Sequence, residues 1–194
     1  MGRKILYELS QELSVLLEDG LESESDGRVP VFFCHPLDVL QDRQSYPEET
    51  FGVLYISAVL PERNYRLSGH DVERSSADSQ VHRRRPPLWV RVRYVFMVAG
   101  GSPETQLTVI AAALETLHDY PLVGPHVESS GGHDTTEGGH PVRIVEEPDA
   151  WRTLGLPEHR LTITFEVICP IASGRTETLD RIEERHLRFQ EARK

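Results

Sequence analysis

The amino-acid sequence predicts a single α+β domain, in which two or three helices pack on a mostly antiparallel, mixed sheet. Segments with helical and strand periodicity follow one another in the order helix, strands, helix, strand, helix. The segment Pro86–Val123 joins one long alternating strand to one amphipathic helix through Gly-Gly-Ser. The chain has 194 residues, of which 38% are hydrophobic, enough for one core but not for two. We therefore expect one domain over residues 1–173 and a charged amphipathic helix over residues 174–194.

The charge balance limits the kinds of partner. The formal net charge is −10, from 21 basic and 31 acidic residues, and binding to phosphate groups needs clustered Lys and Arg. We therefore predict no nucleic-acid partner. The sequence has no signal-peptide core and no run long enough to cross a membrane, so we expect a cytoplasmic protein without a membrane partner. Cys34 and Cys169 lie in separate apolar contexts and are predicted to be reduced.

The first third of the chain contains one helix and two strands in the prediction. Apolar residues recur at helical spacing over Ile5–Leu17, and Gly20 is expected to end that helix. A short apolar run between Pro30 and Pro36 indicates a strand. Residues 37–50 are polar and are predicted to be irregular. The next segment, Phe51–Leu60, is apolar at nearly every position, which indicates a strand buried on both faces.

Residues 68–85 are polar, lack a hydrophobic period and end in Arg83, Arg84 and Arg85. We expect a solvated loop; the alternative is a loop that orders against a neighbouring subunit. The three arginines are expected to pair with acidic residues of this protein or of a neighbour, rather than with an anionic ligand.

The segment Pro86–Val123 is the most regular part of the chain. The even positions of its strand, from Leu88 to Val98, are apolar and should face the core, whereas the other face carries Arg91 and Arg93. We expect these arginines to meet solvent, acidic neighbours or another chain. Ser102 followed by Pro103 is a typical helix start. The predicted buried stripe of this helix consists of Leu107, Ile110, Ala111, Leu114 and Leu117.

The C-terminal part begins with a Gly-rich flexible loop over residues 124–141. A strand over residues 142–147, a helical turn with Trp151 and Leu154, and a strand over Leu161–Cys169 are predicted to follow. Residues 176–194 are predicted to form a charged helix that docks either on the domain itself or in a groove of a partner. Its narrow apolar stripe consists of Leu179, Ile182, His186 and Phe189.

Histidines in the Gly-rich loop raise the question of a metal site. The best cluster is His126, His133, Asp134 and His140, but the histidines are separated by seven residues each through flexible sequence. Zinc ligands normally lie at short, defined spacings on turns or helices. An ordinary solvated loop is therefore favoured, and we predict neither a metal nor another cofactor.

Catalytic motifs are also missing from the sequence. Cys34 and His35 are adjacent in a predicted strand, so they should lie on opposite faces and not form a catalytic pair. The sequence contains no Gly-x-Ser-x-Gly motif, and neither Gly-Gly pair fits a phosphate-binding loop. We therefore do not expect an enzyme.

Several landmarks occur in an order that resembles one known family. They are Leu54-Tyr55 in a buried strand, Pro86-Pro87 before the long strand, Arg93-Tyr94 within it, Pro121 after the helix and Trp151 before the last strand. Over about residues 3–172 the chain is similar to the cap, or tail-terminator, proteins of phage-like extracellular contractile injection systems. Two features depart from that family: some polar residues expected before the last strand are missing, and the tail beyond Gly174 has no counterpart.

The resemblance implies a tail-terminator-like fold and a structural role without catalysis. Six copies would form a ring at the end of the tube and sheath that lies farthest from the baseplate, and would stop both from polymerising. The implied partners are further copies of the chain and the tube and sheath proteins. Two alternatives remain: another structural component of a phage-like tail, such as a baseplate or connector protein, or a metal-binding or enzymatic module that uses loop 126–140. The candidate interface residues are Arg83, Arg84, Arg85, Arg91, Arg93, Leu179, Ile182 and Phe189.

Overall fold

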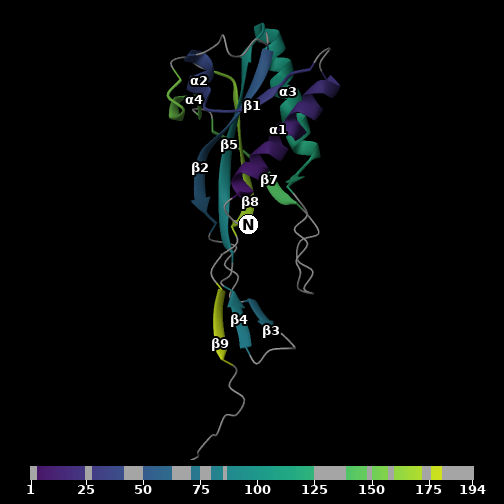
Figure 1. Ribbon diagram of the computed structural model, residues 1–194. Coiled ribbons are helices and arrows are strands. Elements are labelled where there is room, and N and C mark those ends of the chain that lie inside the picture. The colour runs from purple at the N-terminus through teal and green to yellow at the C-terminus, as the bar shows by residue number, and fades with distance from the viewer. Residues whose placement is uncertain are drawn as a thin grey trace, which may run out of the picture.

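The computed structural model has an α+β fold with a curled six-stranded mixed sheet and a separate three-stranded sheet (Figure 1). It describes residues 4–24, 28–41, 50–62, 71–74, 80–84, 87–124, 139–147, 150–156, 160–171 and 176–180. The helices are α1 (Ile5–Glu24), α2 (Pro36–Gln41), α3 (Pro103–Asp119) and α4 (Ala150–Thr153). The strands are β1 (Val31–Phe33), β2 (Thr50–Pro61), β3 (Asp71–Arg74), β4 (Gln80–Arg84), β5 (Leu88–Gly100), β6 (Leu122–Val123), β7 (His140–Val145), β8 (Thr162–Ile171) and β9 (Thr176–Asp180). The predicted fold class is confirmed.

The large sheet has the strand order β1-β2-β5-β8-β7-β6. Strand β1 runs parallel to β2, and all other neighbours in this sheet are antiparallel. Strands β2, β5 and β8 form its long centre, with one irregularity in β2 between Ile56 and Ala58. Such a bulge shifts which residues of β2 face each side.

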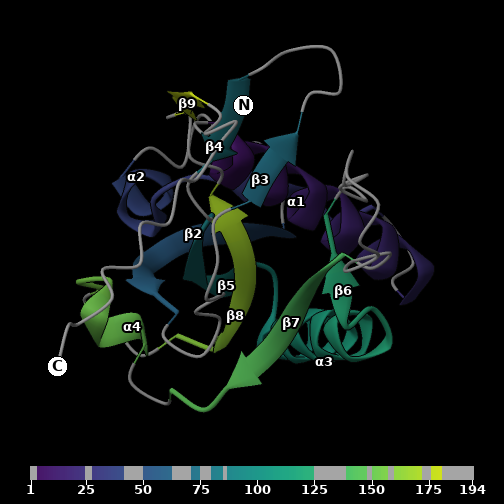
Figure 2. The same cartoon turned by 90° about the horizontal axis from the view of Figure 1, so that it is seen from below.

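The main core lies between the sheet and helices α1 and α3, as Figure 2 shows. The predicted core face of β5 is confirmed from Val90 to Val98, whereas Leu88, at the outer end of the strand, is 58% exposed. The Tyr94 ring stacks on Phe165 with 5.4 Å between the ring centroids, and its hydroxyl lies 3.1 Å from Ser10 Oγ. The buried hydroxyl of Tyr94 is therefore satisfied by α1, which fixes this helix on the sheet.

Contrary to the expectation of one core, a second, smaller core covers part of the opposite face, beneath α2 and α4 (Figure 2). Val95 and Met97 of β5 pack here with Val39 of α2 and with Ala150 and Leu154 around α4. The prediction of irregular structure over residues 37–50 is therefore wrong for its first part. Helix α2 forms because Pro36 suits a first helical position and Val39 buries its side chain in this core.

Gly20 does not end the first helix, contrary to the prediction, because α1 continues to Glu24. A Cβ atom at position 20 would overlap the side chain of Thr116 on α3. The glycine therefore permits the close approach of two helices and does not terminate one. Leu21, in the next position, is 1% exposed, so burial in the core stabilises the last turn of α1.

The buried stripe of α3 also differs from the prediction. The structure buries its small residues, and it leaves Leu107 57% exposed and Leu114 37% exposed. The buried residues of α3 are Val109, Ala112, Ala113, Thr116 and Leu117. The reason is the short distance between α1 and α3, which small side chains on α3 allow. The predicted cap is confirmed, since Ser102 Oγ accepts a hydrogen bond from Thr105 N at 3.2 Å.

The three-stranded sheet corrects two further predictions. Residues 71–74 and 80–84 form strands where a loop was expected, and residues 176–180 form strand β9 where a helix was expected to start. The strand order is β3-β4-β9, with both pairs antiparallel. Thr176 and Thr178 are β-branched and favour a strand, and pairing with β4 supplies backbone partners that a local pattern does not reveal. Residues 181–194 lie outside the described part of the chain.

Most predictions for the remaining elements are confirmed, but β2 is fully buried only from Phe51 to Leu54, and Val59 and Leu60 near its end are exposed. Strand β8 extends the predicted strand to Ile171, and its buried residues include Ile163, Phe165 and Val167. Strand β7 begins at His140, two residues earlier than expected. In the described part of the chain, no helix is both long and apolar enough to cross a membrane.

Candidate interaction surfaces

Arg91 and Arg93 lie on β5, on the face that carries α2 and α4, beyond the second core. Both point at Glu166 of β8, which is directly opposite Arg93 in the sheet register. Arg93 Nη2 lies 2.7 Å from Glu166 Oε1, and Arg93 Nε donates to the same oxygen at 3.0 Å. Arg91 Nη1 lies 3.4 Å from Glu166 Oε2. One carboxylate therefore joins both arginines, with hydrogen bonds strengthened by opposite charges.

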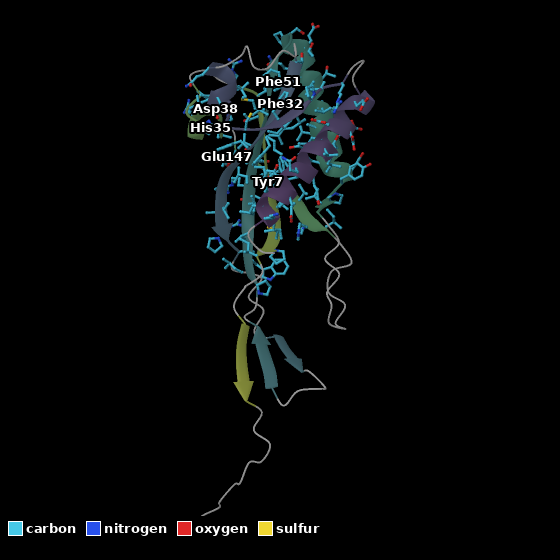
Figure 3. All side chains as sticks on the ribbon, viewed as in Figure 1. Tyr7, Phe32, His35, Asp38, Phe51 and Glu147 are labelled. Atoms are coloured by element: carbon cyan, nitrogen blue, oxygen red, sulfur yellow. The ribbon has the colours of Figure 1, made fainter. Side chains whose placement is uncertain are left out.

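Two further carboxylates complete this charged cluster. Arg91 Nε is 3.1 Å from Glu62 Oε2, just beyond the end of β2, and Arg93 Nη1 is 3.5 Å from Glu147 Oε2, just after β7. Figure 3 shows Glu147 on the side of the sheet that carries His35 and Asp38 of the α2 region. The side chains of Glu62 and Glu166 are only 7% and 5% exposed. The cluster thus connects β2, β5, β8 and the end of β7 across the sheet.

Solvent, acidic neighbours or another chain were the environments expected for Arg91 and Arg93, and the structure shows acidic neighbours. Both guanidinium groups have acidic neighbours in the same chain, so their first role is to hold the sheet together. They remain partly accessible, with 36% of the Arg91 side chain and 27% of the Arg93 side chain exposed. A partner could contact only these outer edges, and burying them further would not leave the arginines unpaired. As interface residues they stay a prediction.

The other candidate interface residues within the described chain lie in the three-stranded sheet. The register places Arg83 of β4 opposite Glu177 of β9, and Arg84 opposite Asp71 of β3. Directly opposed residues of unlike charge favour strand pairing. The pairing of Arg83 with Glu177 could not be predicted from a local pattern, because β4 and β9 are far apart in the chain. Arg85, Ile182 and Phe189 lie outside the described residues.

We call strands β3, β4 and β9 the arm. Strand β2 leads into β3, β4 leads into β5, and β8 leads into β9, so the order β3-β4-β9 repeats the order β2-β5-β8 of the large sheet. In Figure 1 the arm lies beyond the end of the large sheet, away from the four helices. Leu179 on β9 is opposite Val81 on β4, and the alternation of strands places Val72 on the same face. The arm is therefore an outward extension of the three central strands.

Exposed apolar side chains mark further surface beyond the candidate interface residues. Leu107 and Leu114 lie on α3 outside its buried stripe, and both side chains are exposed. On α1, Val15 is 56% exposed. The other large apolar residues with exposed side chains are Tyr7, Val59, Leu60, Leu88, Tyr120, Leu122, Ile144 and Leu161. Tyr7 lies on α1 in Figure 3. A helical wheel of α3 could have shown Leu107 and Leu114 on the flank of a broad apolar arc.

Of the four residues weighed as a possible metal cluster, His140 lies within the described residues, whereas His126, His133 and Asp134 lie outside them. His140 is 7% exposed and lies against Gly124, and burial lowers the pKa of its imidazole. Among the described residues, no group of three or more His, Cys, Asp and Glu side chains is placed to hold a metal ion. Neither Cys34 nor Cys169 forms a disulfide, and burial raises the pKa of Cys169 to about 11. His35 Nδ1 accepts a hydrogen bond from Leu37 N.

Comparison with known proteins gives a family match and matches to solved structures. The sequence model of the family described as "Pvc16 N-terminal domain" matches residues 8–180. No curated protein matches the sequence. A sheath/tube terminator from a PVC extracellular contractile injection system in its extended state matches the fold with a TM-score of 0.58 and 13% identity, over 95% of this chain and 63% of that one.

The cap of the anti-feeding prophage, a tube-terminating cap, matches with a TM-score of 0.55 and 14% identity, over 90% of this chain and 59% of that one. The chain thus spans less than two thirds of the length of either solved structure. At these identities the two likenesses establish the fold.

Proposed function

Because this chain belongs to the Pvc16 N-terminal domain family, we propose that it is a structural cap that ends tube and sheath polymerisation in a contractile injection particle. The observation that carries the proposal is the family match, which extends from residue 8 to residue 180. The fold supports it, since the two solved structures described above are both terminators by their descriptions. The same descriptions favour the terminal position over a baseplate or connector position.

The mechanism of such a cap is surface complementarity rather than catalysis. A heterologous contact repeated by rotation closes into a ring, and the ring then presents a surface to which no further subunit can add. We expect six copies, which would bind the last tube and sheath rings at the end farthest from the baseplate. The particle would assemble in the cytoplasm. Within the described residues, Arg91, Arg93 and Glu166 hold the central strands together, which fits a structural role.

The length of assembled particles tests the proposal. Cells that make the tube, sheath and baseplate proteins together with this chain should yield particles of uniform length in electron micrographs. Cells that lack this chain should yield tubes and sheaths of variable length, or no stable particles. A uniform length distribution without the chain would contradict the proposed function.

A further inference from the structure

We propose that the arm joins neighbouring copies, with β9 of one copy adding to β3 of the next. Within the described part of the chain, β3 and β9 each pair with β4 alone, so each has one edge of backbone donors and acceptors without a strand beside it. Such edges are templates for pairing with another chain. This inference rests on the proposed ring and names the element that closes it.

The direction of the strands fits a ring. Strand β4 is antiparallel to both neighbours, so β3 and β9 run the same way. If the copies are related by rotation about an axis that runs along the strands, the strands of every copy point in the same direction along this axis. Strand β9 of one copy therefore pairs in parallel with β3 of the next copy. Repeated around a closed ring, the three strands of each copy form one continuous barrel. Closure of this kind is the arrangement that removes sheet edges altogether.

In the register in which the two edges are level, no two like charges lie opposite each other. We call residues of β3 and β9 level when they pair with the same residue of β4. Asp71 is level with Thr176, and Glu73 is level with Thr178. Val72 is level with Glu177, so no acidic residue of β3 in these rows is level with an acidic residue of β9. Like charges directly opposite one another would destabilise the pair. A shift by one residue would place acidic residues opposite each other, so this alternation favours one register.

Size and composition also favour a second copy as the occupant. The arm has short strands, and the register places Val72, Val81 and Leu179 on one face together with Arg74, Arg83 and Glu177, so that this face is only partly apolar. A sheet of three strands needs an apolar face that is covered to be stable by itself. Pairing of successive arms aligns these faces into one band, and each copy then gains the strand neighbours that it lacks alone.

A cysteine pair tests the contact in the full-length chain. In one copy β3 and β9 are separated by β4, so residues 73 and 178 lie two strand spacings, or about 9.5 Å, apart. A disulfide cannot bridge Cα atoms more than about 7 Å apart. The double variant Glu73→Cys/Thr178→Cys should therefore form disulfides only between copies. Mild oxidation should give a covalent ladder beyond the dimer on a non-reducing gel.

A matched cysteine variant checks the register within one copy, and native mass spectrometry measures the oligomeric state. Glu73 is opposite His82 in the register, so Glu73→Cys/His82→Cys should oxidise within one copy. The wild type, with Cys34 and Cys169, should give no ladder. If the control does not oxidise within the copy, the register of the arm is wrong and the inference falls. A hexamer without a ladder overturns the contact but leaves the ring, whereas a chain that never forms a hexamer, even with tube and sheath proteins, overturns both.

Discussion

Glu166 is the residue on which the charged cluster depends, because its carboxylate is almost fully buried and binds Arg91 and Arg93 together. Replacing Glu166 with Gln keeps the shape and removes the charge, so both arginines keep their positive charge beside a weaker acceptor. Removing one partner of a fully buried ion pair costs about 3–5 kcal/mol. Both arginines are partly exposed here and solvent screens them, so we expect Glu166→Gln to lower the free energy of unfolding by about 2 kcal/mol.

Urea denaturation followed by circular dichroism measures this effect. Glu146→Gln is the matched control, because Glu146 is acidic, exposed and close to the same edge of the sheet. The control should change the free energy of unfolding by less than about 0.5 kcal/mol. Equal denaturation midpoints for the two variants would show that the cluster does not stabilise the fold.

His140 gives the protein a specific dependence on pH. Burial lowers the pKa of its imidazole below the ordinary value of 6.5, and within the described chain its Nε2 has no hydrogen-bond partner. The unfolded chain therefore binds a proton more readily than the folded chain, so stability is highest above the unfolded pKa. It falls as the pH drops from there through the folded pKa.

His140→Phe should remove this part of the pH dependence, because phenylalanine cannot take up a proton. The free energy of unfolding of the wild type should fall more between pH 7 and pH 5 than that of the variant. The difference between the two slopes is the readout, since the substitution itself changes packing. Parallel curves for the two proteins would rule out this role for His140.

At the scale of elements, the start of α3 could be predicted from the sequence, whereas its buried face could not. Its start at Ser102 and its amphipathic character were readable, because the cap and the helical period are local. The buried face of α3 could not be predicted, because large and small apolar residues lie side by side on the helix. The position of α1 decides which of these residues face the core. Ala113 is fully buried and Ala111, two residues away, is exposed.

The pair Ala113→Leu and Ala111→Leu therefore tests the orientation of α3. Leucine at position 113 would be forced into a packed core, which costs about 1–3 kcal/mol. Leucine at position 111 should change the free energy of unfolding by less than about 0.5 kcal/mol. Chemical denaturation of both variants gives the comparison. A larger loss for Ala111→Leu would mean that the predicted stripe, and not the observed one, faces the core.

Strand β5 and the arm show the same division. The alternation of β5 identified its core face from Val90 to Val98, because one face of a strand repeats every second residue. The partners of Arg91 and Arg93 could not be found in this way, since Glu166 belongs to a strand much farther along the chain. Strand β9 was mistaken for a helix because its partner, β4, lies nearly a hundred residues earlier.

At the scale of the whole molecule, the structure combines a packed body with an extension of its central strands. The body has two cores, one on each face of the large sheet, and the charged cluster holds β2, β5, β8 and the end of β7 together. The arm continues three of these strands outward (Figure 1). A structural subunit of a ring needs such a division, because the body must keep its shape while another element meets the next copy.

The position of the chain in an assembled particle is the most direct test of this account. A gold-labelled copy of the full chain, viewed by electron microscopy on intact particles, reports that position. A terminating cap should place the label at one end of each particle, the end away from the baseplate. Label along the sheath, at the baseplate, or absent from purified particles would contradict a terminating cap.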